Sequence, residues 1–162
     1  MTWSISIAND LPTLYALYSA YNASVASIAN VAGISWSVTL EPLPKAFLQA
    51  SARLGGNMLG LTTNPKGNSL ILVDSSFTWT DDRDTATVRR AGLKLLDDIV
   101  KSAKRLGSHN DWIDVNHADY TQDPFSSYGR ENQQFLQRTS KKYDESQMFQ
   151  KQVPGGFKVF SR

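Results

Sequence analysis

Four polar side chains in this 162-residue chain have the chemistry of catalytic groups: Asp114, Asn116, Glu41 and Asp74. A carboxylate acts as a general acid or base when burial raises its pKa toward the working pH. An amide or a phenol, such as that of Asn116 or Tyr120, stabilises charge on a carbonyl oxygen by donating a hydrogen bond. The alternative for each carboxylate is an ordinary structural role on a solvated strand. We take the four as candidate catalytic residues.

Aromatic and hydroxyl side chains in the same stretches are suited to hold a small molecule. Pockets for small ligands combine aromatic walls with a few polar groups that fix the ligand's orientation. We expect the following residues to bind a ligand beside the candidate catalytic groups: Trp36, Ser37, Thr39, Trp112 and Tyr120.

Several other kinds of site lack the residues that they need. The chain has no Cys, so a thiolate nucleophile or a thiolate metal ligand is impossible. His109 and His117 are its two histidines, and neither lies in an HExxH motif, so we expect no metal site. A GxSxG motif for a serine nucleophile is also absent.

The composition is that of one globular domain, with 41% hydrophobic and 20% charged residues. A net charge of +2 is too small to favour binding to nucleic acid or to an anionic membrane. The chain does not open with a signal-peptide pattern, and no apolar run reaches the roughly 18 residues that span a bilayer. We therefore expect a cytoplasmic protein.

Hydrophobic periodicity predicts the elements that must position these side chains. Alternation of apolar and polar residues predicts strands at residues 3–7, 34–41, 69–79 and 112–118. Apolar spacings of three and four predict helices at residues 11–28, 44–54, 81–106 and within 126–143. Residues 55–61 (GGNMLGL) indicate a tight turn with close packing, and residues 64–68 indicate a second turn.

This order of elements predicts an α+β fold. We expect a ferredoxin-like βαββαβ sandwich, with helices on one face of a mainly antiparallel sheet, followed by a C-terminal helix and tail. Alternation along the expected strand 112–118 places Asp114 and Asn116 on the open face, together with Glu41 and Asp74. His117 would point to the opposite side.

Several short motifs recur here in an order known from one enzyme family. They are Asn116-His117-Ala118, Gln122-Asp123-Pro124, Ser127-Tyr128-Gly129, Lys142-Tyr143-Asp144 and Phe149-Gln150 followed by Pro154-Gly155-Gly156-Phe157-Lys158. Together with GGNMLGL, they resemble the C-terminal substrate domain and tail of fungal FAD-linked oxidases of the berberine-bridge, or vanillyl-alcohol-oxidase, type.

The resemblance implies a substrate-type unit at residues 1–118 and a berberine-bridge-type C-terminal segment at residues 119–162, within a single domain. In that family the open sheet face looks onto the flavin and the substrate, and an N-terminal domain holds the flavin. This length leaves no room for that domain, so we expect no bound FAD unless a partner chain supplies it. Family members usually carry Tyr or Phe where this chain has Asp114, which makes Asp114 the first catalytic candidate.

These features favour a cofactor-free enzyme of fungal secondary metabolism that binds a natural product and catalyses cyclisation, isomerisation or a proton transfer. One alternative is a fragment or split subunit of an FAD-dependent oxidoreductase, and another is a non-enzymatic ligand-binding protein. The expected partners are a small-molecule natural product and a second copy of the chain, paired through the open sheet face.

Overall fold

The computed structural model describes residues 1–61 and 69–160. Its strands are β1 (Thr2–Ala8), β2 (Ser35–Leu43), β3 (Leu70–Thr78) and the short β4 (His109–Asn110). Its helices are α1 (Leu11–Ser27), α2 (Lys45–Arg53), the 3-10 turn η1 (Asp82–Asp84), α3 (Thr85–Leu106), α4 (Pro124–Ser127), α5 (Arg130–Tyr143) and α6 (Met148–Lys151). The turn predicted at residues 64–68 lies outside the described residues.

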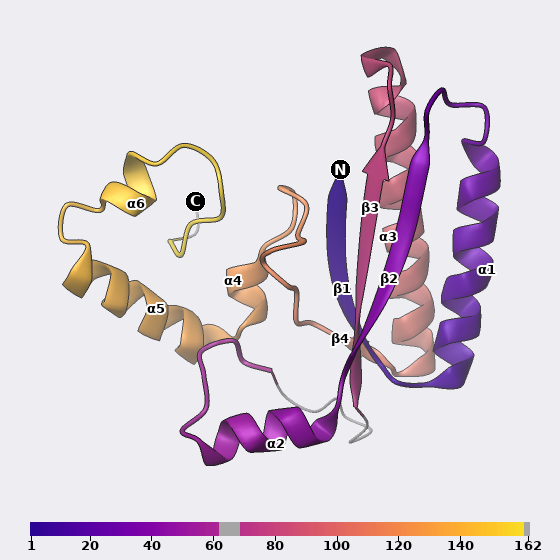
Figure 1. The fold of residues 1–162 in the computed structure, drawn as a ribbon. Helices are drawn as coiled ribbons and strands as arrows, with labels where there is room; N and C mark the ends of the chain where they lie inside the picture. Colours follow the sequence, from indigo (N-terminus) through magenta and orange to yellow (C-terminus); the bar gives the residue numbers. More distant parts are fainter. Residues whose placement is uncertain (62–68, 161–162) are drawn as a thin grey trace.

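The strands form one sheet in the order β2-β3-β1-β4, and each neighbouring pair is antiparallel. Both long helices, α1 and α3, lie on the same side of this sheet (Figure 1). This strand order, with two helical crossovers on one face, is the ferredoxin-like βαββαβ arrangement. The predicted α+β fold is therefore confirmed.

The two long helices begin and end where local chemistry favours it. The Asp10 carboxylate accepts hydrogen bonds from the backbone N–H and the hydroxyl of Thr13, which caps the first turn of α1. Gly107 ends α3 with a φ of 65°, a left-handed conformation that glycine adopts without strain.

No helix in the described part of the chain is long and apolar enough to cross a membrane.

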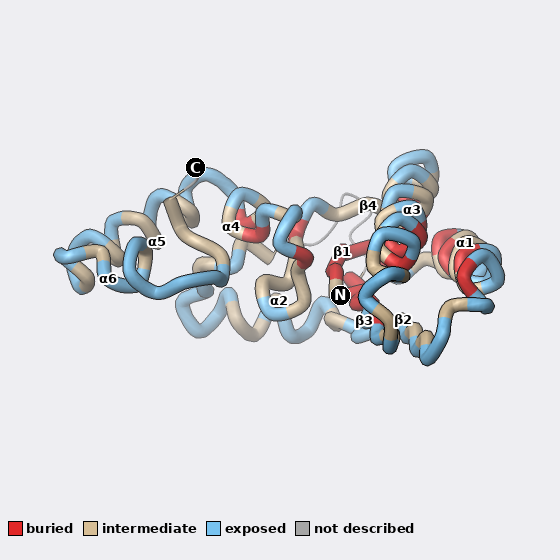
Figure 2. Tube along the Cα trace, turned by 90° about the horizontal axis from the view of Figure 1, so that it is seen from above, coloured by how far each residue is buried: buried red, intermediate tan, exposed pale blue. Residues whose placement is uncertain are grey.

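Alternate strand residues face the two helices and form the main core. Trp3 and Ile7 of β1 and Val73 and Phe77 of β3 are buried against the apolar stripe of α3, which includes Leu95. In the view from above, the buried residues gather along the sheet and on the inner sides of α1 and α3 (Figure 2). The side chains between these positions therefore point to the helix-free, open face of the sheet.

The prediction of a strand at residues 112–118 is wrong. The edge strand β4 consists of His109 and Asn110 alone, and the chain then turns away as a loop. Two side chains account for the break: Asn110 Oδ1 accepts a hydrogen bond from the backbone N–H of Trp112, and Asp114 Oδ1 accepts one from that of Asn116. Such local turns take backbone N–H groups that a sheet would otherwise use.

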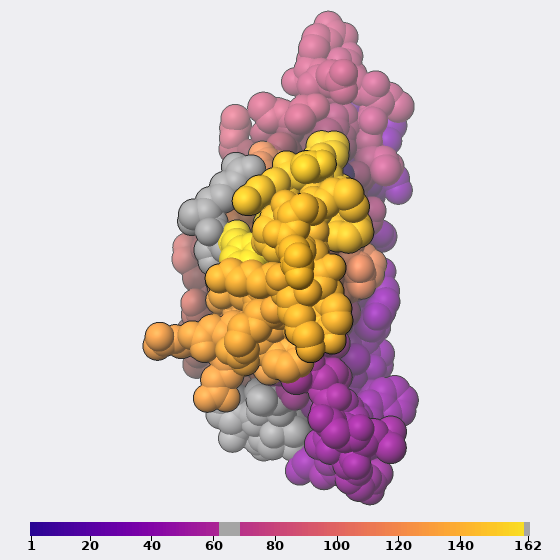
Figure 3. All heavy atoms as spheres, turned by 90° about the vertical axis from the view of Figure 1, so that its left-hand side faces the viewer, coloured from indigo at the N-terminus to yellow at the C-terminus, as the bar shows by residue number. Residues whose placement is uncertain are grey.

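The C-terminal segment forms a second, smaller cluster on the far side of the sheet. Leu72 of β3 is buried there with Trp112 and Tyr128. Gly60 packs against the same place, because a Cβ at this position would lie 2.0 Å from the carbonyl oxygen of Tyr128. The close packing predicted for the GGNMLGL stretch is therefore observed at Gly60. Beyond this cluster, α5 and α6 extend away from the sheet (Figure 1), and this C-terminal segment lies at the front of the molecule in Figure 3.

We predict that Leu95→Ala lowers the free energy of unfolding by about 2–5 kcal/mol, because it leaves a cavity in the main core. Leu95 is 0% exposed. Leu11→Ala is the matched control, since Leu11 is 62% exposed and its loss should cost under about 0.5 kcal/mol. Chemical denaturation of both variants checks this, and equal effects would contradict the core described above.

Candidate functional site

The open face of the sheet is polar at its centre. Thr39 of β2 and Ser4 of β1 lie directly opposite Asp74 of β3 in the antiparallel register. Paired positions place their side chains on the same face of a sheet. Asp74 is thus the middle residue of a polar row that crosses three strands.

Residues 111–123 form a loop that runs over this polar row. The Gln122 side chain holds the loop to β1: its Nε2 donates to the carbonyl of Ser4 at 2.7 Å, and its Oε1 accepts from the N–H of Ser4 at 3.1 Å. The backbone N–H of Asp114 also donates to the Ser4 hydroxyl at 3.4 Å. The Gln122 amide therefore acts on β1 as a neighbouring strand would.

A buried ion pair fixes the same loop to α3. The Arg89 guanidinium lies 3.2 Å from the carboxylate of Asp119, which is 4% exposed. Burial by itself would raise the pKa of Asp119, but hydrogen bonds from Arg89 and Thr121 outweigh burial and hold that pKa below its usual range. Asp119 is therefore held as a carboxylate, and the loop is tied to both layers of the fold.

The loop brings two side chains onto Asp74. His117 Nδ1 lies 2.7 Å from Asp114 Oδ2 and 3.5 Å from Asp74 Oδ2. Asp74 is only 7% exposed, and neither of its carboxylate oxygens makes a hydrogen bond of regular geometry among the described residues, although the Ser4 hydroxyl lies near enough to lower its pKa. We call Asp74, Asp114 and His117 the open-face cluster.

A pocket of about 220 Å³ opens beside this cluster. Its walls come from three strands and the loop: Thr2, Thr39, Glu41, Asp74, Ser75, Ser76 and His117. Two carboxylates, an imidazole and several hydroxyls converge on it, so the pocket favours a polar or cationic group.

The surroundings raise the pKa of two members of the cluster, Asp74 and His117. Burial raises the pKa of Asp74, and the charges of Asp114 and Glu41 add to this effect, while the Ser4 hydroxyl and His117 offset it in part. The hydrogen bond to Asp114 holds the pKa of His117 above its ordinary value, and the Asp74 charge acts in the same sense. Asp74 and His117 therefore keep their protons to a higher pH than they would in water.

The structure brings together part of the predicted site. Asp74, Glu41 and Thr39 line the pocket, and Asp114 contacts it through His117. Ser37 lies on β2 outside the pocket lining and is exposed.

Four other predicted residues lie elsewhere. Asn116 is exposed and donates to Asp114 Oδ1. Trp36 belongs to the helix-side core, 4.3 Å from the ring of Phe77. Trp112 is buried in the second cluster, and Tyr120 is 76% exposed.

Sequence reasoning missed His117. The expected strand turned its side chain toward the helices, whereas the loop turns it toward Asp114. The signal was present in the sequence, because an Asp followed by Asn two residues later is typical of a turn. A turn places residues i and i+3, here Asp114 and His117, side by side.

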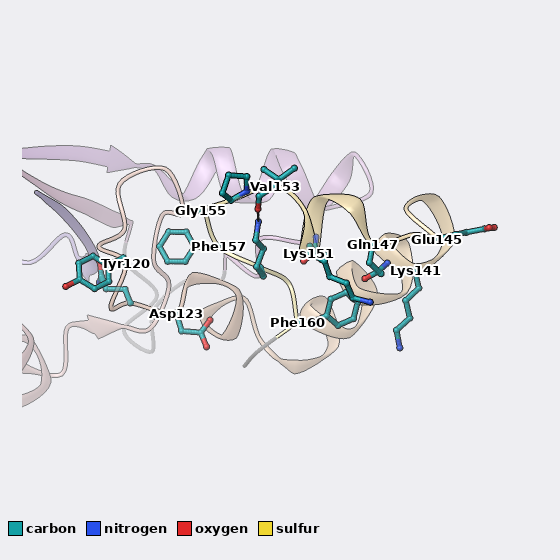
Figure 4. Close-up of a pocket in the computed structure, with 15 residues that line it drawn as sticks. Tyr120, Asp123, Lys141, Glu145, Gln147, Lys151, Val153, Gly155, Phe157 and Phe160 are labelled. Carbon is teal, nitrogen blue, oxygen red and sulfur yellow. Dashed lines mark hydrogen bonds between the residues drawn. The ribbon is translucent and has the colours of Figure 1, made fainter.

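A larger hollow of about 1160 Å³ lies within the C-terminal segment (Figure 4). Its lining includes Tyr120, Lys141, Phe157 and Phe160, and none of its lining residues is buried. Because it holds no buried ionisable group among the described residues, we place the candidate chemistry at the open-face pocket instead.

In a phosphate-binding loop, glycines let backbone N–H groups approach the ligand. Gly60 of the GGNMLGL stretch is instead explained by packing, because it lies against the backbone of Tyr128. A metal ion is a candidate ligand elsewhere, since one ligand atom from each member of the open-face cluster lies within 4.8 Å of the others.

Several known proteins are similar in sequence to this chain. The FAD-dependent monooxygenase FUP4 of Fusarium proliferatum is 37% identical over 121 residues, or 74% of this chain and 23% of that protein. The chain is similar to fungal FAD-dependent monooxygenases. The FAD-dependent monooxygenase drtC of Aspergillus calidoustus is 34% identical over 129 residues, or 78% of this chain and 24% of that protein.

A third relative is named as an oligopeptidase and not as a monooxygenase. The oligopeptidase PhomG' of Diaporthe leptostromiformis is 34% identical over 161 residues, which is 98% of this chain and 13% of that protein. The chain thus spans between an eighth and a quarter of the length of these relatives. No family model and no solved structure matches it significantly. The resemblance to fungal flavin-dependent enzymes is confirmed, while the berberine-bridge type stays a prediction.

We predict that Gln122→Ala loosens the loop over the open face. The change leaves the buried N–H of Ser4 without its partner, which should cost about 1–3 kcal/mol. Hydrogen exchange should show faster opening of residues 111–119, while the strands keep their protection. Gln134→Ala, at an exposed position of α5, is the control. Unchanged exchange in the loop would show that Gln122 does not hold it.

Proposed function

We propose that this chain supplies the substrate-facing surface of an FAD-dependent oxidoreductase, of the berberine-bridge type, that acts on a natural product. The similarity to several fungal FAD-dependent monooxygenases supports the enzyme class. The open face of the sheet supports the role of this part, because its pocket is polar and lies on the side that carries neither α1 nor α3.

The observation that carries the proposal is the carboxylate of Asp74. It is 7% exposed, makes no hydrogen bond of regular geometry among the described residues and lines the pocket. Burying an unpartnered polar group is costly, and such a group in a pocket marks a place where a ligand completes the bonding. We assign Asp74 as the anchor for the polar end of the substrate, with Thr39 and Glu41 beside it.

In this proposal the chain binds and orients the substrate. Redox chemistry would belong to a flavin, as the names of the FAD-dependent relatives suggest, and the open-face pocket would hold the substrate. The pocket of about 220 Å³ suits the polar end of a molecule, so the rest of the substrate would extend out of it.

A second candidate is the cofactor-free cyclase or isomerase that the sequence favours. One observation favours it: the pocket is lined by two carboxylates, Asp74 and Glu41, and by the His117 imidazole, which are groups that transfer protons without a cofactor. We do not propose peptidase activity for this chain. The match covers 13% of the oligopeptidase, and no described serine hydroxyl is hydrogen-bonded to a histidine. The homodimer through the open face stays a prediction.

We predict that Asp74→Asn, introduced at the gene in its host, lowers formation of the pathway product by about 100-fold. Loss of the anchor misplaces the substrate, and misplacement of this kind costs about that factor. Comparative metabolite profiling by mass spectrometry measures the product and its accumulating precursor. Ser37→Ala, on the same face but outside the pocket, is the control.

The outcomes separate the candidates. Normal product with Asp74→Asn would contradict both enzymatic proposals and leave a ligand-binding protein. Product formed in vitro by the purified protein without flavin absorbance would contradict the flavin-dependent role and support the cyclase or isomerase.

A further inference from the structure

Hydrogen bonding among the described residues does not explain the open-face cluster in full. The contact of 2.7 Å between His117 Nδ1 and Asp114 Oδ2 satisfies those two side chains. Asp74 stays unsatisfied, although it is 93% buried and its carboxylate faces the pocket. A ligand that binds Asp74 together with the other two would account for all three.

The spacing of the ligand atoms suits a metal ion. Metal–ligand bonds of about 2.0–2.2 Å place neighbouring ligand atoms about 3.0–3.4 Å apart. In the cluster, His117 Nδ1 lies 2.7 Å from Asp114 Oδ2 and 3.5 Å from Asp74 Oδ2. All three ligand atoms lie within 4.8 Å of one another, so the two carboxylates would move closer together as they enter one coordination sphere.

Charge also favours a cation at this point. The carboxylates of Asp74, Asp114 and Glu41 surround one imidazole, and no lysine or arginine lines the pocket among the described residues. Carboxylate oxygens with one imidazole nitrogen suit zinc, manganese and ferrous iron.

We propose that Asp74, Asp114 and His117 bind a divalent transition-metal ion at the floor of the open-face pocket. Three protein ligands leave further coordination positions, and the pocket beside them gives water or a substrate oxygen access to the ion. This inference goes beyond the proposed function and does not depend on it. If both hold, Asp74 anchors the substrate through the ion.

The site explains why three residues from distant parts of the chain meet. Asp74 comes from the middle of β3, while Asp114 and His117 come from the loop that Gln122 and Asp119 tie down. A fixed loop is what a metal site needs, because its ligands must be held in place before the ion arrives.

A second His–Asp pair in the chain serves as a control for the proposed metal site. His109 Nδ1 lies 3.4 Å from Asp111, a His–Asp pair of similar spacing, but the side chain of Asp111 is 92% exposed and no third ligand group joins the pair in the part of the chain that the structure describes. A metal that simply prefers histidine next to aspartate would bind both pairs. A built site would bind at His117 alone.

The experiment is a titration of the chelator-treated, purified chain with Zn²⁺, followed by competition with a chromophoric chelator. We expect one equivalent to bind, with affinity at least about 100-fold weaker in Asp74→Asn and in His117→Ala, and unchanged in His109→Ala. Loss of a direct ligand should exceed the 10- to 100-fold that outer contacts cost. Circular dichroism checks that each variant is folded.

A second measurement keeps the proposal testable if a variant fails to fold. Zn²⁺ added to the wild-type protein should shift the NMR signals of the His117 ring and leave those of His109 in place. No bound equivalent of Zn²⁺, or equal effects at the two histidines, would overturn the proposal. Because no substrate or flavin is present, this failure is distinct from failure of the proposed function.

Discussion

The side-chain amide of Gln122 holds the site together. Its two hydrogen bonds to the backbone of Ser4 continue the sheet beyond β4, which ends after two residues. A real strand at this edge would have pointed successive side chains to opposite faces. The loop instead turns both Asp114 and His117 toward Asp74, which a continuous strand 112–118 could not do.

The loop held by Gln122 brings its side chains to the buried carboxylate of Asp74. A buried carboxylate without a hydrogen bond of regular geometry weakens the fold, and proteins keep such groups mainly where function requires them. The surrounding fold can bear this cost because it has a separate core on the other face of the sheet, built from β1, β3, α1 and α3. The candidate site and the main core thus lie on opposite faces of the same strands.

Much of the fold follows from the sequence, because hydrophobic periodicity reports which face of an element is buried. Alternation along residues 34–41 put Thr39 and Glu41 on the open face, and they line the pocket. The same alternation groups Trp36 with Val38 on the helix side, so expecting Trp36 in a ligand site conflicted with the pattern itself. Its indole N–H reaches Ser75 within the sheet.

The remainder of the site depends on contacts that periodicity does not report. The turn at Asp114 and the anchor at Gln122 join residues more than 100 positions apart in the chain. No local pattern encodes such contacts, so the sequence predicted Asp114 on the open face for the wrong reason and left His117 out. A search for metal-ligand motifs likewise does not bring out the proposed metal site, because Asp74 meets Asp114 and His117 only through the fold.

The measurement that tests this account most directly is the NMR titration of both histidines in the metal-free protein. With Asp114, Asp74 and Glu41 around it, His117 should have a pKa above the ordinary value of about 6.5, while burial lowers the pKa of His109. Asp114→Asn should bring the pKa of His117 down toward that value and leave His109 unchanged. A His117 pKa at or below about 6.5 that ignores this substitution would contradict the account.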